Sequence, residues 1–107
     1  MPLMIMSFNL RDGVGEEEFL RKAKEFIHYN QANVQGLGAT QLYRHHGIGA
    51  NRRMYQVHME FEDFGTWDRF VALTEKDAKA AKLYRENWQE LIEMRTHYDE
   101  MVKEIPL

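Results

Sequence analysis

The segment from Thr40 to Phe61, TQLYRHHGIGANRRMYQVHMEF, constrains the fold of this chain more than any other stretch. Polar and apolar residues alternate on both sides of the break Gly47-Ile48-Gly49-Ala50-Asn51, and glycine-containing loops of this length often join antiparallel strands. The segment is therefore predicted to form a β-hairpin. Pairing the strands through this loop gives three opposed pairs on one face: Thr40 with His58, Leu42 with Gln56, and Arg44 with Met54.

The alternation gives the hairpin two faces of different character. One face of the second strand is apolar, and we expect helices to cover it; its residues are Tyr55, Val57, Met59 and Phe61. The pairing adds Gln41, Tyr43 and His45 to that face. The opposite face is mixed, with Met54, Gln56, His58 and Glu60. A slip of one residue would exchange the faces of the first strand, so the sequence does not assign His45 and His46.

Length and charge bound the classes of function. A chain of 107 residues fits one compact domain over 1–107. The net charge of -3 offers no attraction to nucleic acid, and Arg52-Arg53 is too short for a basic patch. The chain contains no cysteine, which excludes disulfides and thiolate sites and favours the cytoplasm. The N-terminal MPLMIM run is too short to cross a membrane and lacks the features of a signal peptide.

Hydrophobic periodicity predicts the elements that flank the hairpin. The segment Leu3 to Leu10 is apolar on both faces, as in a central strand. A helix is expected over Glu16 to Val34, with Gly36 as its stop. Its inward residues are Phe19, Leu20, Ala23, Phe26, Ile27, Asn30 and Val34.

Two further helical segments follow the hairpin. Asp63 is the expected cap of a short helix with an inward stripe of Phe64, Trp67, Phe70, Val71 and Thr74. The helix then continues over Lys76 to Ile92, with Ala81, Tyr84, Trp88, Leu91 and Ile92 inside. The last segment, Met94 to Ile105, is ambiguous, because its apolar spacing fits a helix while a strand remains open.

This order of elements is that of an α+β ferredoxin-like sandwich, a four-stranded antiparallel sheet with helices on one face. Together with the phrase FEDFGTWDRFVALTEKDAKAAKLYRENWQELI after the third strand, it resembles the dimeric α/β-barrel superfamily. That grouping includes antibiotic-biosynthesis monooxygenases, EthD-like and NIPSNAP-like domains, and stress-responsive barrel proteins. The resemblance implies that Arg95 to Ile105 is the fourth strand and that the uncovered sheet face meets a second subunit.

His58 is the first candidate for chemistry. In mid-strand, beside Gln56 and near Arg44, its imidazole can orient a polar ligand group or act as a general base. The alternative is a hydrogen-bonded histidine in an interface. Arg44 can likewise anchor a carboxylate or pair with an acid such as Glu60. The full set expected to contact a ligand is Asn9, Leu42, Tyr43, Arg44, Met54, Gln56, His58, Trp67 and Tyr98, with His58 as the catalytic candidate.

We expect no metal and no cofactor. His45 and His46 are neighbours in a strand and point to opposite faces, so they do not readily share an ion, even with His58, His97 or Asp99 nearby. Heme-degrading members of the superfamily use a helix histidine after two small residues, with a strand Asn and a Trp. Asn9 and Trp67 are loose counterparts here, but Ala80-Ala81 is followed by Lys82, so the axial imidazole is missing.

The methionines suggest a cavity. Met4, Met6, Met54, Met59, Met94 and Met101 are either core filler or the flexible lining of a site for an apolar ligand. We therefore expect a homodimer that holds an apolar ligand with a polar or acidic head, fatty-acid-like or aromatic, between sheet and helices or at the dimer interface. The alternative is a cofactor-independent monooxygenase or isomerase that acts on a small organic substrate, with His58 as base. A dimer with no pocket remains a third interpretation.

Overall fold

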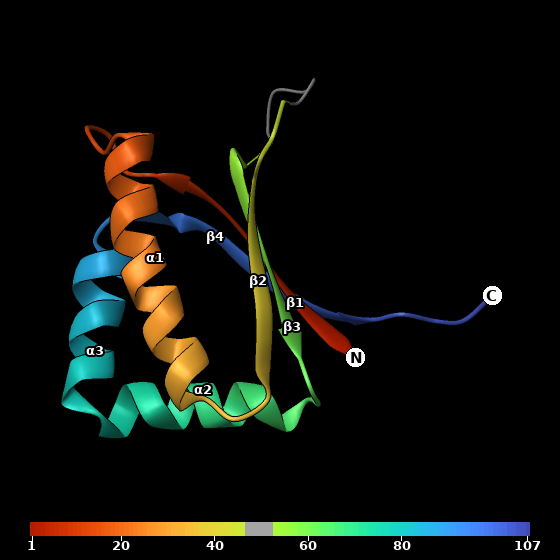
Figure 1. Cartoon of the computed structure of the whole chain (residues 1–107). Helices are drawn as coiled ribbons and strands as arrows, with labels where there is room; N and C mark the ends of the chain where they lie inside the picture. Colours follow the sequence, from red (N-terminus) through yellow and green to blue (C-terminus); the bar gives the residue numbers. More distant parts are fainter. Residues whose placement is uncertain (47–52) are drawn as a thin grey trace.

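Four antiparallel strands form one sheet in the order β2-β3-β1-β4, and the helices pack on one of its faces (Figure 1). The computed structural model describes residues 1–46 and 53–107, so the Gly47–Asn51 break and Arg52 lie outside the described residues. The elements are β1 (Pro2–Leu10), α1 (Glu16–Asn33), β2 (Leu37–Arg44), β3 (Tyr55–Phe61), α2 (Gly65–Lys76), α3 (Ala78–Tyr84), the π-helical turn η1 (Arg85–Gln89) and β4 (Ile92–Lys103). The predicted ferredoxin-like α+β fold is confirmed.

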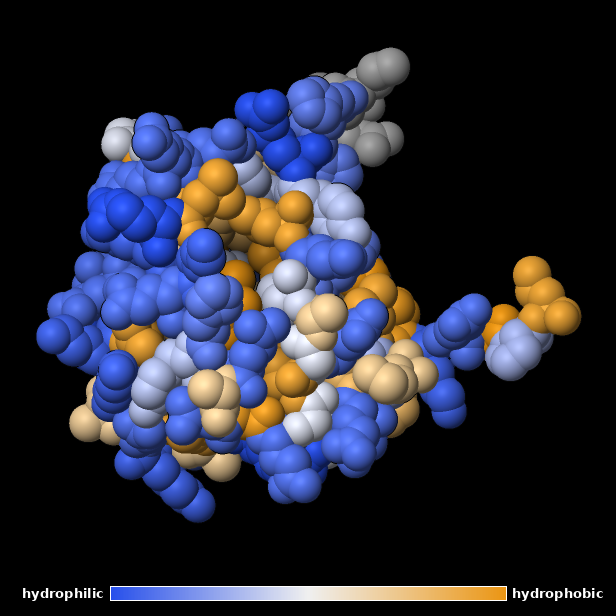
Figure 2. Space-filling view, in the orientation of Figure 1, coloured by the Kyte–Doolittle hydropathy of each residue, from blue (hydrophilic) through white to orange (hydrophobic). Residues whose placement is uncertain are grey.

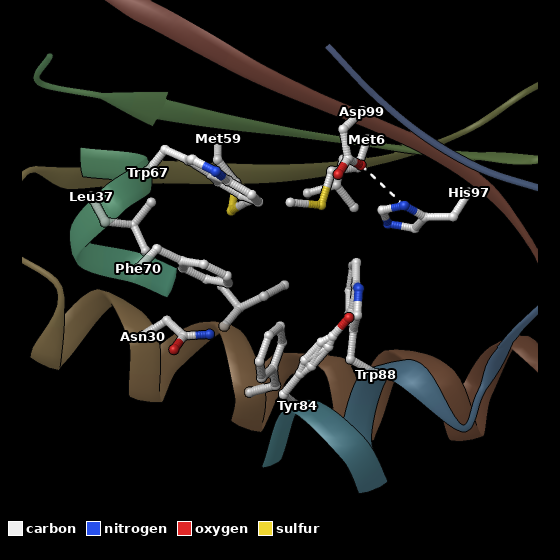
Figure 3. Close-up of a pocket in the computed structure, with 13 residues that line it drawn as sticks. Met6, Asn30, Leu37, Met59, Trp67, Phe70, Tyr84, Trp88, His97 and Asp99 are labelled. Carbon is white, nitrogen blue, oxygen red and sulfur yellow. Dashed lines mark ion pairs between the residues drawn. The ribbon is translucent and has the colours of Figure 1, made fainter. Parts of the chain in front are cut away.

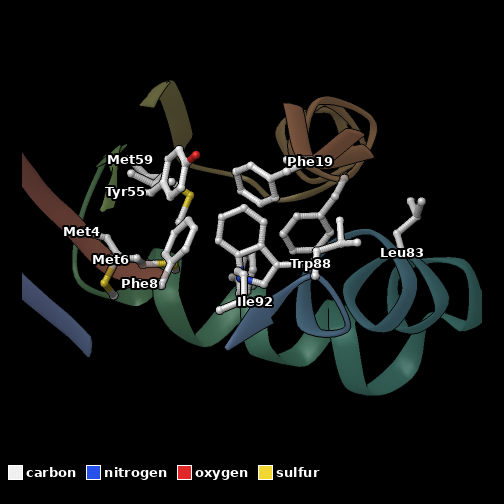
Figure 4. Close-up of a cluster of buried hydrophobic side chains, with 14 of the residues drawn as sticks. Met4, Met6, Phe8, Phe19, Tyr55, Met59, Leu83, Trp88 and Ile92 are labelled. Carbon is white, nitrogen blue, oxygen red and sulfur yellow. The ribbon is translucent and has the colours of Figure 1, made fainter. Parts of the chain in front are cut away.

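Aromatic side chains from the sheet and the helices form the centre of the core (Figure 4). Phe8 of β1 is fully buried, and its ring lies 5.6 Å from that of Phe19 and 5.2 Å from that of Trp88 between centroids. Both pairs meet edge to face, a geometry that adds to the free energy of area burial. This cluster joins α1 and η1 to the middle of the sheet.

The chain between α2 and β4 differs from the single helix predicted over Lys76 to Ile92. Asp77 has an extended backbone, and its carboxylate accepts hydrogen bonds from the backbone N–H groups of Lys79 and Ala80. It is therefore an N-cap, which ends α2 and starts α3 in a new direction. The helical part closes with η1, and Ile92 already belongs to β4. Phe64, predicted to point inward, is 55% exposed because it precedes the first turn of α2.

The hairpin register is shifted by one residue from the predicted pairing. Arg44 lies opposite Tyr55, Leu42 opposite Val57, and Thr40 opposite Met59. Leu42 and Arg44 therefore share the helix side of the sheet with Val57, whereas Gln41 and Tyr43 lie on the open side with Gln56 and His58. The predicted faces of the first hairpin strand are wrong, because the loop does not fix the register.

The last segment is a strand, as the resemblance implied, although its local apolar spacing fits a helix. β4 pairs with β1 along most of its length, from Pro2 opposite Lys103 to Leu10 opposite Ile92, with an irregularity between Ser7 and Asn9. Residues of β4 therefore alternate between the helix side and the open side of the sheet.

In residues 1–46 and 53–107, no helix is long and apolar enough to span a membrane.

Candidate functional site

A cavity of about 70 Å³ lies between the sheet and the helices (Figure 3). The sheet contributes Met6, Leu37, Val57, Met59, His97 and Asp99 to its wall. The helices and η1 contribute Phe26, Ile27, Asn30, Trp67, Phe70, Tyr84 and Trp88. The lining is thus mostly aromatic, aliphatic or thioether, with polar groups at a few points, as in small-molecule sites.

His97 and Asp99 project from β4 at one end of this cavity (Figure 3). They are two residues apart in a strand, so both side chains point to the helix side. His97 Nδ1 lies 3.1 Å from the carboxylate of Asp99, and the imidazole stacks on the Phe8 ring at 6.1 Å between centroids. The carboxylate and the ring together fix the orientation of the imidazole.

The other ring nitrogen of His97 has no partner. Nε2 is the one fully buried side-chain polar atom without a hydrogen bond in the described parts of the chain. Because Nδ1 faces a carboxylate, the neutral ring carries its proton on Nδ1, and Nε2 presents a lone pair. An unsatisfied buried acceptor costs roughly 1–3 kcal/mol, so a donor that reaches Nε2 is favoured.

Burial shapes the acid–base properties of this end of the cavity. It raises the pKa of Asp99 above its ordinary value, and the neighbouring His97 opposes this by favouring the carboxylate. Burial also raises the pKa of Tyr84, with a further contribution from the negative charge of Asp99. Tyr84 therefore keeps its hydroxyl proton as a hydrogen-bond donor at the cavity wall.

The open face of the sheet holds several of the residues predicted from the sequence to contact a ligand. His58 Nε2 lies 2.7 Å from the side-chain oxygen of Gln56, and the ring of Tyr43 is 4.7 Å from the imidazole. Tyr98 is on the same face, since Ser7 pairs with both Tyr98 and Gln56. His58 therefore already has a hydrogen-bond partner, and the structure leaves its catalytic role a prediction.

The other predicted ligand contacts are scattered. Trp67 lines the cavity with His97, and Leu42 lies at the helix side of β2. Arg44 lies 3.6 Å from the Glu16 carboxylate, so its charge is paired. The Asn9 side chain accepts a hydrogen bond from the backbone N–H of Met54, whose own side chain is 47% exposed. Their ligand-binding roles stay predictions.

A shallow groove lies between α1 and β2, and Figure 2 shows apolar surface at several places on this side of the molecule. Leu20 and Leu42 line it, and Glu16 and Arg44 are also part of its wall. Tyr55 donates a hydrogen bond of 3.1 Å to the Glu16 carboxylate. Glu16, Arg44 and Tyr55 in this groove are therefore partners of one another, unlike Nε2 of His97.

A metal site finds no support in the described residues. In residues 1–46 and 53–107, no three His, Cys, Asp or Glu side chains are grouped closely enough to hold an ion. His97 and Asp99 are only two potential ligands, and their contact is an ion pair or hydrogen bond.

Comparison with known proteins supports the fold. No family model and no curated protein matches the sequence. Among solved structures, a protein from Arabidopsis thaliana has a TM-score of 0.80 at 10% identity and covers 100% of this chain and 98% of its own. SnoaB, a cofactor-independent oxygenase from Streptomyces nogalater, has a TM-score of 0.72 at 10% identity and covers 99% of this chain and 94% of its own.

A third solved structure of this fold is described as dimeric. A dimeric protein of unknown function with a ferredoxin-like fold, from Bacteroides fragilis, has a TM-score of 0.61 at 18% identity. It covers 95% of this chain and 94% of its own. At such identities the likeness shows the fold alone, which is the ferredoxin-like fold that the resemblance implied.

Proposed function

We propose that this protein binds a compact, largely apolar molecule between its sheet and helices, with a donor group of the ligand on His97 Nε2. The unpaired Nε2 is the observation that carries the proposal. Buried polar atoms without partners are rare in folded proteins, and those that occur often belong to functional sites. A ligand O–H or N–H would supply the missing hydrogen bond.

The size of the cavity narrows the ligand. One water needs roughly 10–15 Å³, against about 70 Å³ here. The cavity thus suits a group the size of one ring better than a long acyl chain. Its flat walls agree with this, since the rings of Trp67 and Phe70 stack at 5.6 Å between centroids and 11° between planes. Met6 and Met59 add flexible contacts that adapt to a ring edge.

The test compares 4-methylphenol with toluene, which has the same ring but no hydroxyl. Both tryptophans of the chain, Trp67 and Trp88, line the cavity, so their fluorescence reports occupancy. We expect wild type to bind 4-methylphenol about tenfold more tightly, the value of one good hydrogen bond. His97→Phe should lose this preference, and His58→Phe should keep it. If no ring compound binds, or if His97→Phe keeps the preference, the proposal is wrong.

A second candidate is catalysis by the same pair. With Nδ1 held by Asp99 and Nε2 itself fully buried, Nε2 of His97 has the geometry of a general base. It would remove a proton from an enolisable or phenolic substrate, and return of that proton to another atom would give an isomerisation. The SnoaB likeness supports an oxygenase alternative, in which the deprotonated substrate carbon reacts with O₂ as the oxidant, so that a CH₂ group becomes a carbonyl and the second oxygen atom leaves as water.

Turnover by single variants would separate the two histidines. We expect His97→Ala to abolish any base-dependent turnover of enolisable or phenolic substrates. His58→Ala should leave that turnover within about twofold of wild type, because His58 is on the other side of the sheet. Loss of turnover in His58→Ala alone would instead favour the role predicted for His58 from the sequence.

We further propose that the chain forms a homodimer through the open face of the sheet. Three apolar or aromatic side chains on this face remain exposed: Tyr43 at 45%, Tyr98 at 52% and Val102 at 38%. Exposed apolar side chains on a sheet face without helices can be covered by a second subunit. The Bacteroides fragilis protein of the same fold is dimeric, which supports dimerisation of this chain without indicating the face used. His58 and Gln56 would then be a hydrogen-bonded pair within the interface, and light scattering would measure the assembly.

For location, we keep the cytoplasm as a proposal. The chain of 107 residues has no cysteine, so its fold requires no oxidising compartment.

A further inference from the structure

A second polar side chain lies at the end of the cavity opposite His97. Asn30 projects from the inner face of α1 and is only 2% exposed. Unlike His97 Nε2, its amide is not fully enclosed, because it faces the cavity, and it makes no hydrogen bond to another group within the described ranges 1–46 and 53–107. Figure 3 shows Asn30 near Leu37 and Phe70, on the far side of the cavity from His97. A buried amide normally makes at least one hydrogen bond, because leaving both its donor and its acceptor unpaired is costly.

Most of the wall between these two groups is apolar. Phe70, Met59 and Ile27 lie along it and offer no hydrogen bond. Apart from the indole N–H groups of Trp67 and Trp88, which can only donate, the polar contacts available to an occupant lie at the two ends, near His97 with the Tyr84 hydroxyl at one end and near Asn30 at the other. An occupant that carries only one polar group leaves one of these ends unsatisfied.

The charges around the cavity restrict the occupant further. Among the described residues, its lining contains no Lys or Arg, and Asp99 contributes a carboxylate. A permanently anionic head such as a fatty-acid carboxylate would be taken out of water beside a group of the same sign, which is unfavourable. A neutral head avoids this cost and can still donate to Nε2 of His97.

We propose that the ligand of this cavity is an uncharged, ring-sized molecule with hydrogen-bonding groups at two opposite ends, a hydroxyl on His97 Nε2 and a carbonyl or similar acceptor on the Asn30 amide. The inference rests on the proposed binding function and narrows it. It selects a neutral, two-ended molecule over the acidic-headed ligand expected from the sequence, and it makes Asn30 a residue that determines specificity.

The test uses two phenols of similar shape. 4-Hydroxyacetophenone carries a carbonyl opposite its hydroxyl, and 4-isopropylphenol has a methyl group where that carbonyl oxygen would be. Calorimetric titration of wild type should give about tenfold tighter binding of 4-hydroxyacetophenone. In Asn30→Leu this preference should fall at least fivefold, because the amide partner is gone. The two phenols also differ in the acidity of their hydroxyl groups. Any preference that remains in Asn30→Leu measures the effect of this difference on affinity.

Asn33→Leu is the matched control, since Asn33 is exposed on the same helix and bonds only the Tyr29 carbonyl. It should keep the wild-type preference. An unchanged preference in Asn30→Leu would overturn the inference while leaving the binding function intact. Failure of wild type to bind either phenol would instead overturn the proposed function, and the inference with it. If Asn30→Leu does not fold, equal affinities of wild type for the two phenols would still refute the inference.

Discussion

The two faces of the sheet differ in how deeply they bury their side chains. On β3, Tyr55, Val57 and Met59 point to the helices and are at most 8% exposed, while Gln56 and His58 between them are only half-buried. The histidines follow this division. His58 on the open face has a partner in Gln56, and His97 on the covered face has a free, buried Nε2. A histidine on a strand is therefore a candidate for chemistry according to which face it occupies.

The largest expected difference between the faces concerns stability. Phe8→Ala removes a ring at 0% exposure that contacts Phe19 and Trp88. We expect it to lower the free energy of unfolding by about 3–5 kcal/mol. Ile5→Ala, on the opposite face of the same strand, should cost less than half as much. Urea denaturation measures both, and equal losses would remove the distinction between a covered and an open face.

The next effect concerns the open face as an interface. Val102→Asp adds a charge beside Leu3 on that face, with Glu60 on the next strand. Burial of an unpaired carboxylate in a symmetric contact should weaken the dimer by about 2 kcal/mol or more, or roughly 30-fold in its dissociation constant. Sedimentation at several concentrations would detect this. A variant that associates as tightly as wild type would place the interface elsewhere.

A smaller effect is expected on the stability of the ligand-free protein, where substitutions of His97 and His58 should differ. His97→Phe replaces the unsatisfied Nε2 with an apolar ring stacked on Phe8, so we expect stability to be unchanged or higher by about 1 kcal/mol. His58→Phe removes the bond to Gln56 on the open face and should not stabilise the protein. Thermal or urea unfolding of both variants would measure these changes in the free energy of unfolding. A stability that is unchanged or higher in His97→Phe would show that the fold does not require His97.

The smallest expected effect is in pH dependence. Because burial raises the pKa of Asp99 in the folded state, the folded protein binds more protons than the unfolded chain between the ordinary Asp value of about 3.9 and the raised value. The free energy of unfolding should therefore fall as pH rises through this interval. Asp99→Asn should remove this part of the slope in urea titrations at a series of pH values. Identical slopes in both proteins would contradict the assignment.

Much of the architecture could be predicted from the sequence, since the apolar periodicities of β1, α1 and β3 depend on local spacing. The hairpin register could not be predicted, because a glycine-containing loop permits a slip of one residue. The observed register places Leu42 and Arg44 on the other face from the one predicted. Asp77 did offer a signal, as a capping residue within an otherwise helical stretch. Only its backbone conformation shows that the helix restarts there.

The site was harder to predict for a related reason. His97 and Asp99 share a face only if β4 is a strand, and the local pattern around them favoured a helix. Once the strand is accepted, their spacing of two residues is enough to bring them together. Asn30 was visible as the polar member of an apolar helical stripe. That its amide lacks a partner is a property of the packed structure, which no local pattern contains.

The ring nitrogens of the histidines offer the most direct test that the covered face holds the ligand. Long-range ¹H–¹⁵N spectra of ¹⁵N-labelled protein, recorded with and without 4-hydroxyacetophenone, report the hydrogen bonding of each Nε2. We expect the Nε2 signal of His97, assigned by its loss in His97→Phe, to shift on binding while that of His58 stays in place. A shift at His58 with none at His97 would contradict the account.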